Sequence, residues 1–113
     1  METKNRVLIA DIDDDFRRLI SDVLSREEDM EYLGGTDNGV DALALTAELH
    51  PDVIVLDLVL LKLDGLEVLR RLPEACPDTK AIIVTHMYRS EIIKQCAALG
   101  AAEGQKFAAL GVD

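Results

Sequence analysis

The short apolar run at residues 53–56 restricts the fold of this chain more than any other segment. It begins soon after Pro51 and ends at the acidic residue Asp57. A run of this length between such boundaries predicts a strand that is buried on both faces, as in parallel sheets covered by helices. Asp57 would then lie at the carboxyl end of the strand, where ligands bind to open α/β sheets.

The same order of residues occurs near the start of the chain. The apolar run at 7–10 ends in Asp11, and three further aspartates follow at 13–15. If the two strands are neighbours, Asp11 and Asp57 meet at one edge of the sheet. Because two close carboxylates repel each other, such a site calls for a hard cation. The sequence therefore outlines a metal-assisted phosphoryl site.

Strand-like and helix-like segments alternate along the chain, which is typical of an α/β fold with a doubly wound parallel sheet. We expect strands near residues 6–11, 30–35, 52–57 and 80–85. We expect helices near residues 14–26, 38–49, 65–72 and 89–99.

Two of these helices have apolar residues at helical spacing that are expected to face the core. In the first helix they are Phe16, Leu19, Ile20, Val23 and Leu24. The second helix would be capped by Asp37 or Asn38. Its core-facing residues would be Val40, Leu43, Ala44 and Ala47.

Length, charge and cysteine content limit the class of protein. A chain of 113 residues that is 49% hydrophobic predicts a single domain over 1–113, regular over about 6–100. Its net charge of −10 argues against direct contact with nucleic acid. No apolar run approaches the roughly 18 residues of a membrane span. Cys76 and Cys96 lack metal or redox spacing, and two scattered cysteines indicate a reducing cytoplasm.

Several segments, in their order and spacing, resemble the receiver domain of bacterial two-component response regulators, most closely the receiver of the sporulation master regulator. The resemblance runs from about residue 6 to 100 and rests on residues 7–11, 38–39, 51–57, 63–65, 82–85 and 99–101. It implies a flavodoxin-like fold in which Asp57 accepts a phosphoryl group from a phosphohistidine partner. It also implies that Asp11, Asp57 and the backbone carbonyl of Val59 hold Mg²⁺, and that the Thr85 hydroxyl contacts the phosphoryl group.

The chain departs from this family at three places. Ile12 stands where the family has a second acidic metal ligand, and Asp13 could supply the missing oxygen if the loop adjusts. Leu61 replaces a usual proline. After Gly100 no apolar run predicts a fifth strand, and Lys106 aligns with the family's buried lysine only if one residue is deleted. We expect an irregular or truncated fifth strand and fifth helix, or their exchange with another copy.

The implied function is that of a phosphoacceptor switch whose output is binding and not enzymatic turnover. Its partners would be a histidine kinase or phosphotransfer protein, and a DNA-binding output domain outside this chain. A homodimer, or a dimer that exchanges the C-terminal segment, stays open.

Other interpretations also stay open. The chain could be a degenerate receiver that works as an interaction module without phosphorylation, which magnesium titration would distinguish. Residues 8–13 also resemble the nucleophile motif of haloacid-dehalogenase-type phosphatases, with Asp11 attacked and Asp13 as the acid. In purely structural terms, Asp57 would be a polar strand end and Asp13 an acidic residue at a helix start.

Overall fold

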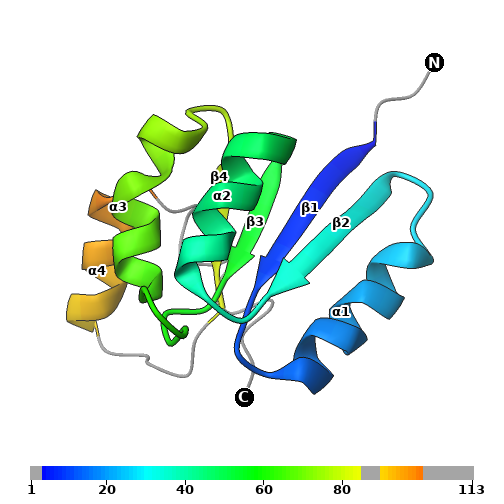
Figure 1. Cartoon of the computed structure of the whole chain (residues 1–113), viewed down its shortest axis with the longest axis horizontal. Coiled ribbons are helices and arrows are strands. Elements are labelled where there is room, and N and C mark those ends of the chain that lie inside the picture. Colours follow the sequence, from blue (N-terminus) through cyan, green and yellow to red (C-terminus); the bar gives the residue numbers. More distant parts are fainter. Residues whose placement is uncertain (1–3, 85–89, 101–113) are drawn as a thin grey trace.

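The computed structural model describes residues 4–84 and 90–100. Strands and helices alternate throughout this part of the chain, as predicted (Figure 1). The elements are β1 (Asn5–Ala10), α1 (Asp14–Ser25), β2 (Met30–Thr36), α2 (Gly39–Leu49), β3 (Val53–Leu56), α3 (Gly65–Ala75), β4 (Lys80–Ile83) and α4 (Ser90–Ala98). The expected fifth strand and fifth helix fall after residue 100, outside the described residues.

The four described strands form one parallel sheet in the order β2-β1-β3-β4. The order confirms the doubly wound, flavodoxin-like fold. In such a sheet the chain turns to opposite sides at the boundary between β1 and β3, and ligands bind at the carboxyl ends of these two strands. Asp11 and Asp57 each directly follow one of them.

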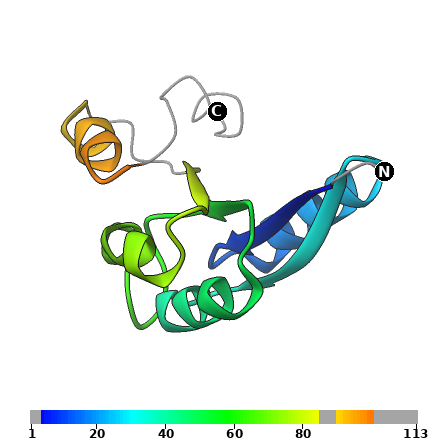
Figure 2. The same cartoon turned by 90° about the horizontal axis from the view of Figure 1, so that it is seen from above.

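Hydrophobic side chains are buried on both faces of the sheet, because successive strand residues point to opposite sides. On one face, Leu8, Ile54 and Ile83 belong to a cluster with α2 and α3. On the other face, Val7, Ile9 and Val55 pack with Phe16, Ile20 and Leu24 of α1 and with other partly buried residues. Figures 1 and 2 show α2 and α3 side by side, with α1 apart from them beside β2.

The predicted core faces of the first two helices need correction. In α1, Leu19 and Val23 are 57% and 45% exposed, since the sheet contacts only the opposite part of the apolar stripe. In α2, the buried residues are Gly39, Ala42 and Thr46; of the predicted core-facing residues, Leu43 is partly buried, and Val40, Ala44 and Ala47 are exposed. Thr46 can be buried because its hydroxyl donates to the carbonyl of Ala42 at 2.7 Å.

Polar side chains fix the starts of three helices. Asp13 caps α1, Asn38 caps α2 and Asp64 caps α3, and each accepts hydrogen bonds from backbone N–H groups in the first turn. Of the two residues considered as the cap of α2, Asn38 has this role, because its Oδ1 accepts from the N–H of Asp41 at 2.7 Å. These caps set the entry of each helix from the same sheet edge that carries Asp11 and Asp57.

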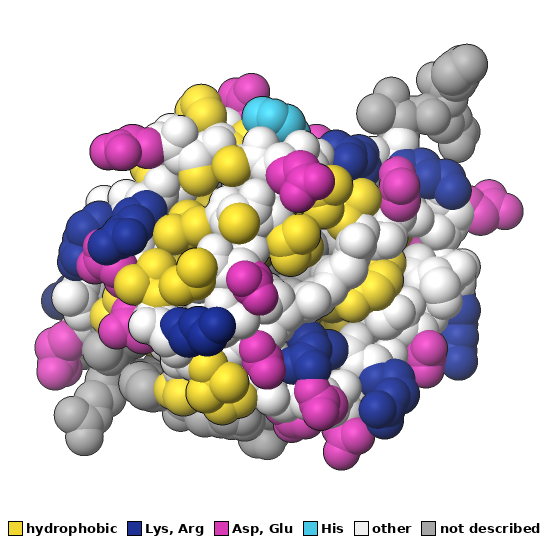
Figure 3. All heavy atoms as spheres, viewed as in Figure 1, with side chains coloured by type: hydrophobic (Ala, Val, Ile, Leu, Met, Phe, Trp, Pro, Cys, Tyr) yellow, Lys and Arg dark blue, Asp and Glu magenta, His cyan; other side chains and the backbone are white. Residues whose placement is uncertain are grey.

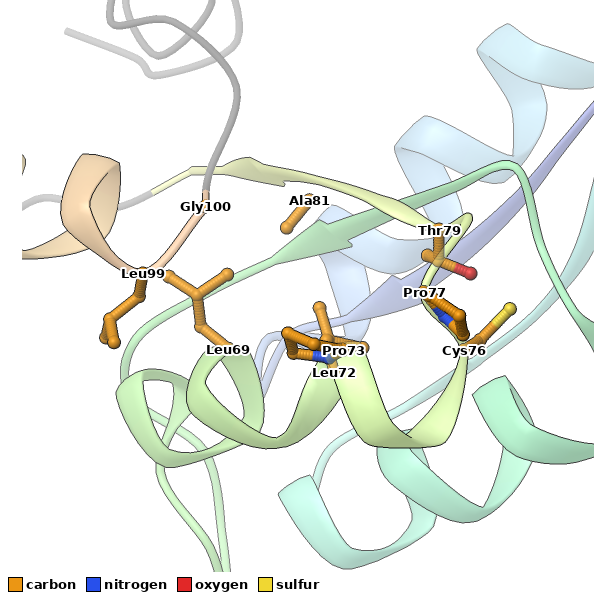
Figure 4. A pocket seen from close by; sticks show the side chains of 9 residues that line it. All are labelled: Leu69, Leu72, Pro73, Cys76, Pro77, Thr79, Ala81, Leu99 and Gly100. Carbon is orange, nitrogen blue, oxygen red and sulfur yellow. The ribbon is translucent and has the colours of Figure 1, made fainter.

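Helix α3 extends past the end expected from sequence at residue 72. It continues through Pro73 to Ala75, and the N–H of Cys76 still donates to the carbonyl of Leu72 at 2.8 Å. Proline lacks the N–H that would bond to the carbonyl of Leu69, but this loss lies in the last turns of the helix. A cavity of about 210 Å³ lies beside this end of α3, against β4 and the end of α4 (Figure 4).

The charged side chains on the surface are of both signs. Acidic and basic side chains are interspersed on the face drawn in Figure 3, and no continuous basic area is seen there. Within the described residues, no helix is long and apolar enough to cross a membrane. Cys76 and Cys96 are both buried free thiols.

Candidate functional site: an acidic edge between β1 and β3

The register of β1 and β3 brings Asp11 and Asp57 to neighbouring positions. Ala10 pairs with Leu56 at the end of the ladder, so the next residues along the two strands are Asp11 and Asp57. The N–H of Asp57 donates to the carbonyl of Ala10 at 2.9 Å, which extends the ladder to this point. Because neighbouring strands lie about 4.8 Å apart, the two carboxylates lie close together.

The environment of the Asp11 carboxyl raises its pKa above the ordinary aspartate value. Asp11 is 6% exposed, and burial is the main factor that raises its pKa. The N–H of Asp13, which donates to Asp11 Oδ1 at 2.9 Å, lowers the pKa. The charges of Asp57 and Asp13 raise it, and the charge of Arg17 lowers it. The net increase shows that negative charge at Asp11 is poorly compensated by the protein alone.

We expect Asp11→Asn to stabilise the protein at neutral pH in buffer without divalent cations. The folded state raises the pKa of Asp11, so stability contributed by this group falls as pH rises from the ordinary aspartate pKa of about 3.9 through the raised value. Above that range the wild type carries the full penalty, which the substitution removes. The melting temperature should therefore be a few degrees higher for the variant at pH 7.

Thermal unfolding from pH 3 to pH 8 measures this effect. The difference between variant and wild type should shrink as the pH falls below about 3.9, because Asp11 then becomes protonated in both the folded and the unfolded state. Asp78→Asn, at an exposed position, is the matched control for the loss of one carboxylate. A variant that is less stable than wild type at pH 7 would contradict the prediction.

The side chain of Asp13 is engaged in capping α1. Its Oδ1 accepts from the N–H groups of Asp15 and Phe16 at 2.9 and 3.2 Å. Ile12, where an acidic ligand was missing from the sequence pattern, is 42% exposed and supplies no oxygen. Among residues 4–84 and 90–100, no group of three acidic, histidine or cysteine side chains is arranged to hold a metal ion. A cation at this edge would therefore rely on Asp11, Asp57 and backbone or water oxygens.

The loop after Asp57 is held by backbone contacts. The N–H of Val59 lies 3.4 Å from Asp57 Oδ1. The N–H of Leu61 donates to the carbonyl of Asp37 at 3.0 Å, and the carbonyl of Leu61 accepts from the N–H of Gly39 at 3.0 Å. A proline at position 61 has no N–H and could not donate to the carbonyl of Asp37. The loop is thus tied to the start of α2.

Three residues contribute to this edge in ways that were not assigned from the sequence, although Gly39 and Gly65 lie in segments of the resemblance. The guanidinium of Arg17 donates to the backbone carbonyl of Asp11 and pairs with Asp14. Gly65 and Gly39 approach other backbone atoms so closely that an added Cβ would lie 2.2 Å from the carbonyl oxygen of Asp57 and 2.0 Å from that of Leu63, respectively. The spacing of Asp14 and Arg17 at i and i+3 was the available signal for their ion pair.

Two predicted site residues, Thr85 and Lys106, lie outside the described residues. The described chain continues one residue past β4 to Val84, whose N–H donates to the carbonyl of Leu56 at 3.0 Å. The chain therefore reaches the residue before Thr85 beside the end of β3. The structure brings Asp11, Asp13, Asp57 and Val59 to one edge, and the roles of Thr85 and Lys106 stay predictions.

Comparison with known proteins gives a consistent result. The family model described as the response regulator receiver domain matches residues 7–104. The virulence-factor transcription regulator BvgA of Bordetella pertussis is 39% identical over 98 residues, which cover 87% of this chain and 46% of BvgA. The chain thus spans about half the length of this relative.

Solved structures show the same architecture. The response regulator domain of Thermotoga maritima CheB superposes with a TM-score of 0.82 at 28% identity, over 88% of this chain and 75% of that chain. A chain of the CheX–CheY–BeF3–Mg²⁺ complex of Borrelia burgdorferi superposes with a TM-score of 0.80 at 16% identity, over 96% and 85% of the two chains. The second likeness is one of fold.

Proposed function

The chain belongs to the response regulator receiver domain family, and we propose that its acidic edge accepts a phosphoryl group on Asp57 with the help of Mg²⁺. The observation that carries this proposal is the register that places Asp57 beside the buried Asp11 at the carboxyl edge of β1 and β3. In the reaction, an oxygen of the Asp57 carboxylate bonds to phosphorus while the bond from phosphorus to the donor breaks. The product is an acyl phosphate.

The residues of this edge fit Mg²⁺ as a weakly held ion. Mg²⁺ is usually bound by one or two carboxylates together with waters and phosphate oxygens, so Asp11 and Asp57 with the Val59 carbonyl suffice. Bound Mg²⁺ would neutralise charge on the carboxylates and on the transferring oxygens. Because Ile12 offers no ligand and Asp13 is engaged as a cap, we expect lower affinity than two adjacent acidic residues would give.

The proposed output is a change in binding. A phosphoryl group adds a charge near −2, which biases the arrangement of the loop that begins at Thr85 and of α4. Thr85, and Lys106 if it reaches the site, would contact the phosphoryl oxygens. The donor would be a histidine kinase or a phosphotransfer protein. The target would be a DNA-binding output domain outside this chain, in keeping with the description of BvgA as a transcription regulator.

Intact-mass measurement after incubation with acetyl phosphate and Mg²⁺ tests this function. We expect wild type to gain the mass of one phosphoryl group and Asp57→Asn to gain none, because the amide is not a nucleophile for this transfer. The gain should also vanish when EDTA removes Mg²⁺. Val59→Ala, which keeps the backbone carbonyl, is the matched control and should be phosphorylated like wild type.

The same assay separates the main alternative, a degenerate receiver that binds partners without phosphorylation. No gain at any Mg²⁺ concentration in folded wild-type protein would exclude the proposed function and favour this alternative. In that case the Ile12→Asp variant is tested in the same assay, because position 12 is exposed and tolerates an added carboxylate. A gain of one phosphoryl group by this variant would attribute the loss of function to the missing metal ligand. The family match and the capping role of Asp13 both disfavour the dehalogenase-type phosphatase interpretation.

A further inference from the structure

Arg17, in the first turn of α1, reaches the end of β1 with a side chain that is largely shielded from water. That side chain is 19% exposed, although arginine side chains lie mostly in solvent. The guanidinium donates to the backbone carbonyl of Asp11 and pairs with Asp14. Helix α1 lies beside β2 (Figure 1), and an added Cβ at Gly35 of that strand would lie 3.1 Å from Cδ of Arg17. The guanidinium is therefore placed by α1, β1 and β2 together.

The backbone of Asp11 is bound on both sides. Its N–H donates to the carbonyl of Thr36 in β2 at 3.0 Å, and its carbonyl accepts from Arg17. Its carboxylate is also held, because Oδ1 accepts from the N–H of Asp13 at 2.9 Å. Since the carbonyl belongs to the peptide that joins Asp11 to Ile12, the contact with Arg17 fixes the direction in which the chain leaves β1.

The contact of Arg17 and the cap of α1 act on the same short segment. Asp13 accepts from N–H groups of the first helical turn, and its carbonyl accepts from the N–H of Arg17 at 3.1 Å. The side chain of Ile12, between them, is 42% exposed and has no polar group. The turn from Asp11 into α1 is thus held by polar contacts of Asp13 and Arg17.

The orientation of the Asp11 carboxylate determines how well this edge can hold Mg²⁺. Because Ile12 offers no oxygen and Asp13 is engaged as a cap, Asp11 and Asp57 are the carboxylates of the described edge that remain for the ion. Mg²⁺ requires nearly octahedral ligation at about 2.0–2.1 Å and tolerates displaced ligands poorly. Removing a group that orients a metal ligand typically lowers metal affinity by roughly 10- to 100-fold.

We propose that Arg17 is a positioning residue of this site, which holds the Asp11 peptide so that Asp11 and Asp57 can share one Mg²⁺ ion. The inference rests on the proposed function of the same edge. Charge alone predicts the opposite effect, because a cation beside the site repels Mg²⁺. The ion pair with Asp14 keeps the guanidinium in place and offsets part of this charge. Removal of the Arg17 side chain therefore distinguishes positioning from charge.

Titration of the full chain with Mg²⁺ by isothermal titration calorimetry, without a phosphodonor, measures this role. We expect Arg17→Met, which keeps an aliphatic stem and removes the donors, to raise the dissociation constant for Mg²⁺ about tenfold. Arg17→Lys should lie between this variant and wild type, because an ammonium donates but lacks the planar fork that serves two partners. Arg18→Met removes the same charge at the neighbouring exposed position and should bind Mg²⁺ like wild type.

Two further measurements separate positioning from a general loss of structure. Circular dichroism verifies that each variant is folded, and Ile20→Ala, which removes packing of α1 on the sheet, should leave the dissociation constant for Mg²⁺ unchanged. The Mg²⁺ concentration that gives half-maximal phosphorylation by acetyl phosphate should rise in Arg17→Met. The rate at saturating Mg²⁺ should stay near that of wild type, because Asp57 is intact.

Two results would overturn the inference. One is binding of Mg²⁺ by folded Arg17→Met that is as tight as, or tighter than, binding by wild type. The other is wild type that binds no Mg²⁺. Wild type that binds Mg²⁺ but gains no phosphoryl group would instead overturn the proposed function of Asp57, and the titration would still decide the role of Arg17.

Discussion

Replacing Gly65 by alanine is expected to lower the free energy of unfolding by about 3 kcal/mol and to impair phosphorylation of Asp57. An added Cβ would lie 2.2 Å from the carbonyl oxygen of Asp57 and 2.6 Å from the Cα of Leu58. Both are backbone atoms, so the clash cannot be relieved by rotating a side chain. The first turn of α3 or the loop after β3 has to move, and the loop carries the candidate phosphoacceptor.

Urea denaturation and the intact-mass assay together measure this effect. Alanine has a higher helix propensity than glycine by about 1 kcal/mol, so the substitution would stabilise α3 if the close contact were unimportant. A stability equal to or above that of wild type would therefore contradict the prediction. Val59→Ala serves as the control in the same loop, because its side chain is 49% exposed and its loss should change stability by less than about 0.5 kcal/mol.

The alternation of elements was predictable from sequence because it depends on short-range patterns. The strand at 53–56 was expected to reach 57, and the helix from 14 to end at 26, each within one residue of the observed end. Helix α3 was expected to end before Pro73, where sequence rules place a helix boundary. The structure continues to Ala75, and the N–H of Cys76 still donates to the carbonyl of Leu72.

The side of each helix that faces the core was less predictable. In α2, Gly39 fits against the carbonyl of Leu63, and this contact turns Ala42 and Thr46 toward the sheet in place of Val40. Such a close approach between the start of α2 and the loop before α3 depends on tertiary structure and leaves no local periodic signal. In α1, the apolar stripe is wider than the surface that the sheet covers, which leaves Leu19 and Val23 exposed.

The site was predictable in part. Two apolar runs that end in aspartate indicated that Asp11 and Asp57 meet, and the register confirms that they follow neighbouring strands at the same level. The contact of Arg17 with the Asp11 carbonyl required the helix geometry. The assignment of Lys106 depends on an alignment across a segment without apolar periodicity, and the closer likeness to the sporulation master regulator also stays a prediction.

Replacing Ile54 by alanine should lower the free energy of unfolding by about 3 to 4 kcal/mol. Ile54 is fully buried in the central strand β3, within the cluster that joins the sheet to α2 and α3. The substitution removes three carbon atoms from a packed interior, and neighbouring strand residues cannot move far enough to fill the space. For a domain whose total stability is about 5 to 15 kcal/mol, this is a large fraction.

Two graded substitutions identify the cause as lost packing. Ile54→Val should cost only about 1 kcal/mol, and Val40→Ala, at an exposed position of α2, should cost almost nothing.

Ile54 points to the face of the sheet opposite to that of Val53 and Val55, whereas Asp57 follows the alternation of those two residues. Folded Ile54→Ala protein should therefore still gain a phosphoryl group, whereas Asp57→Asn should keep its stability and gain none. Loss of phosphorylation in fully folded Ile54→Ala protein would mean that the acidic edge depends on core packing more strongly than its backbone ladder indicates.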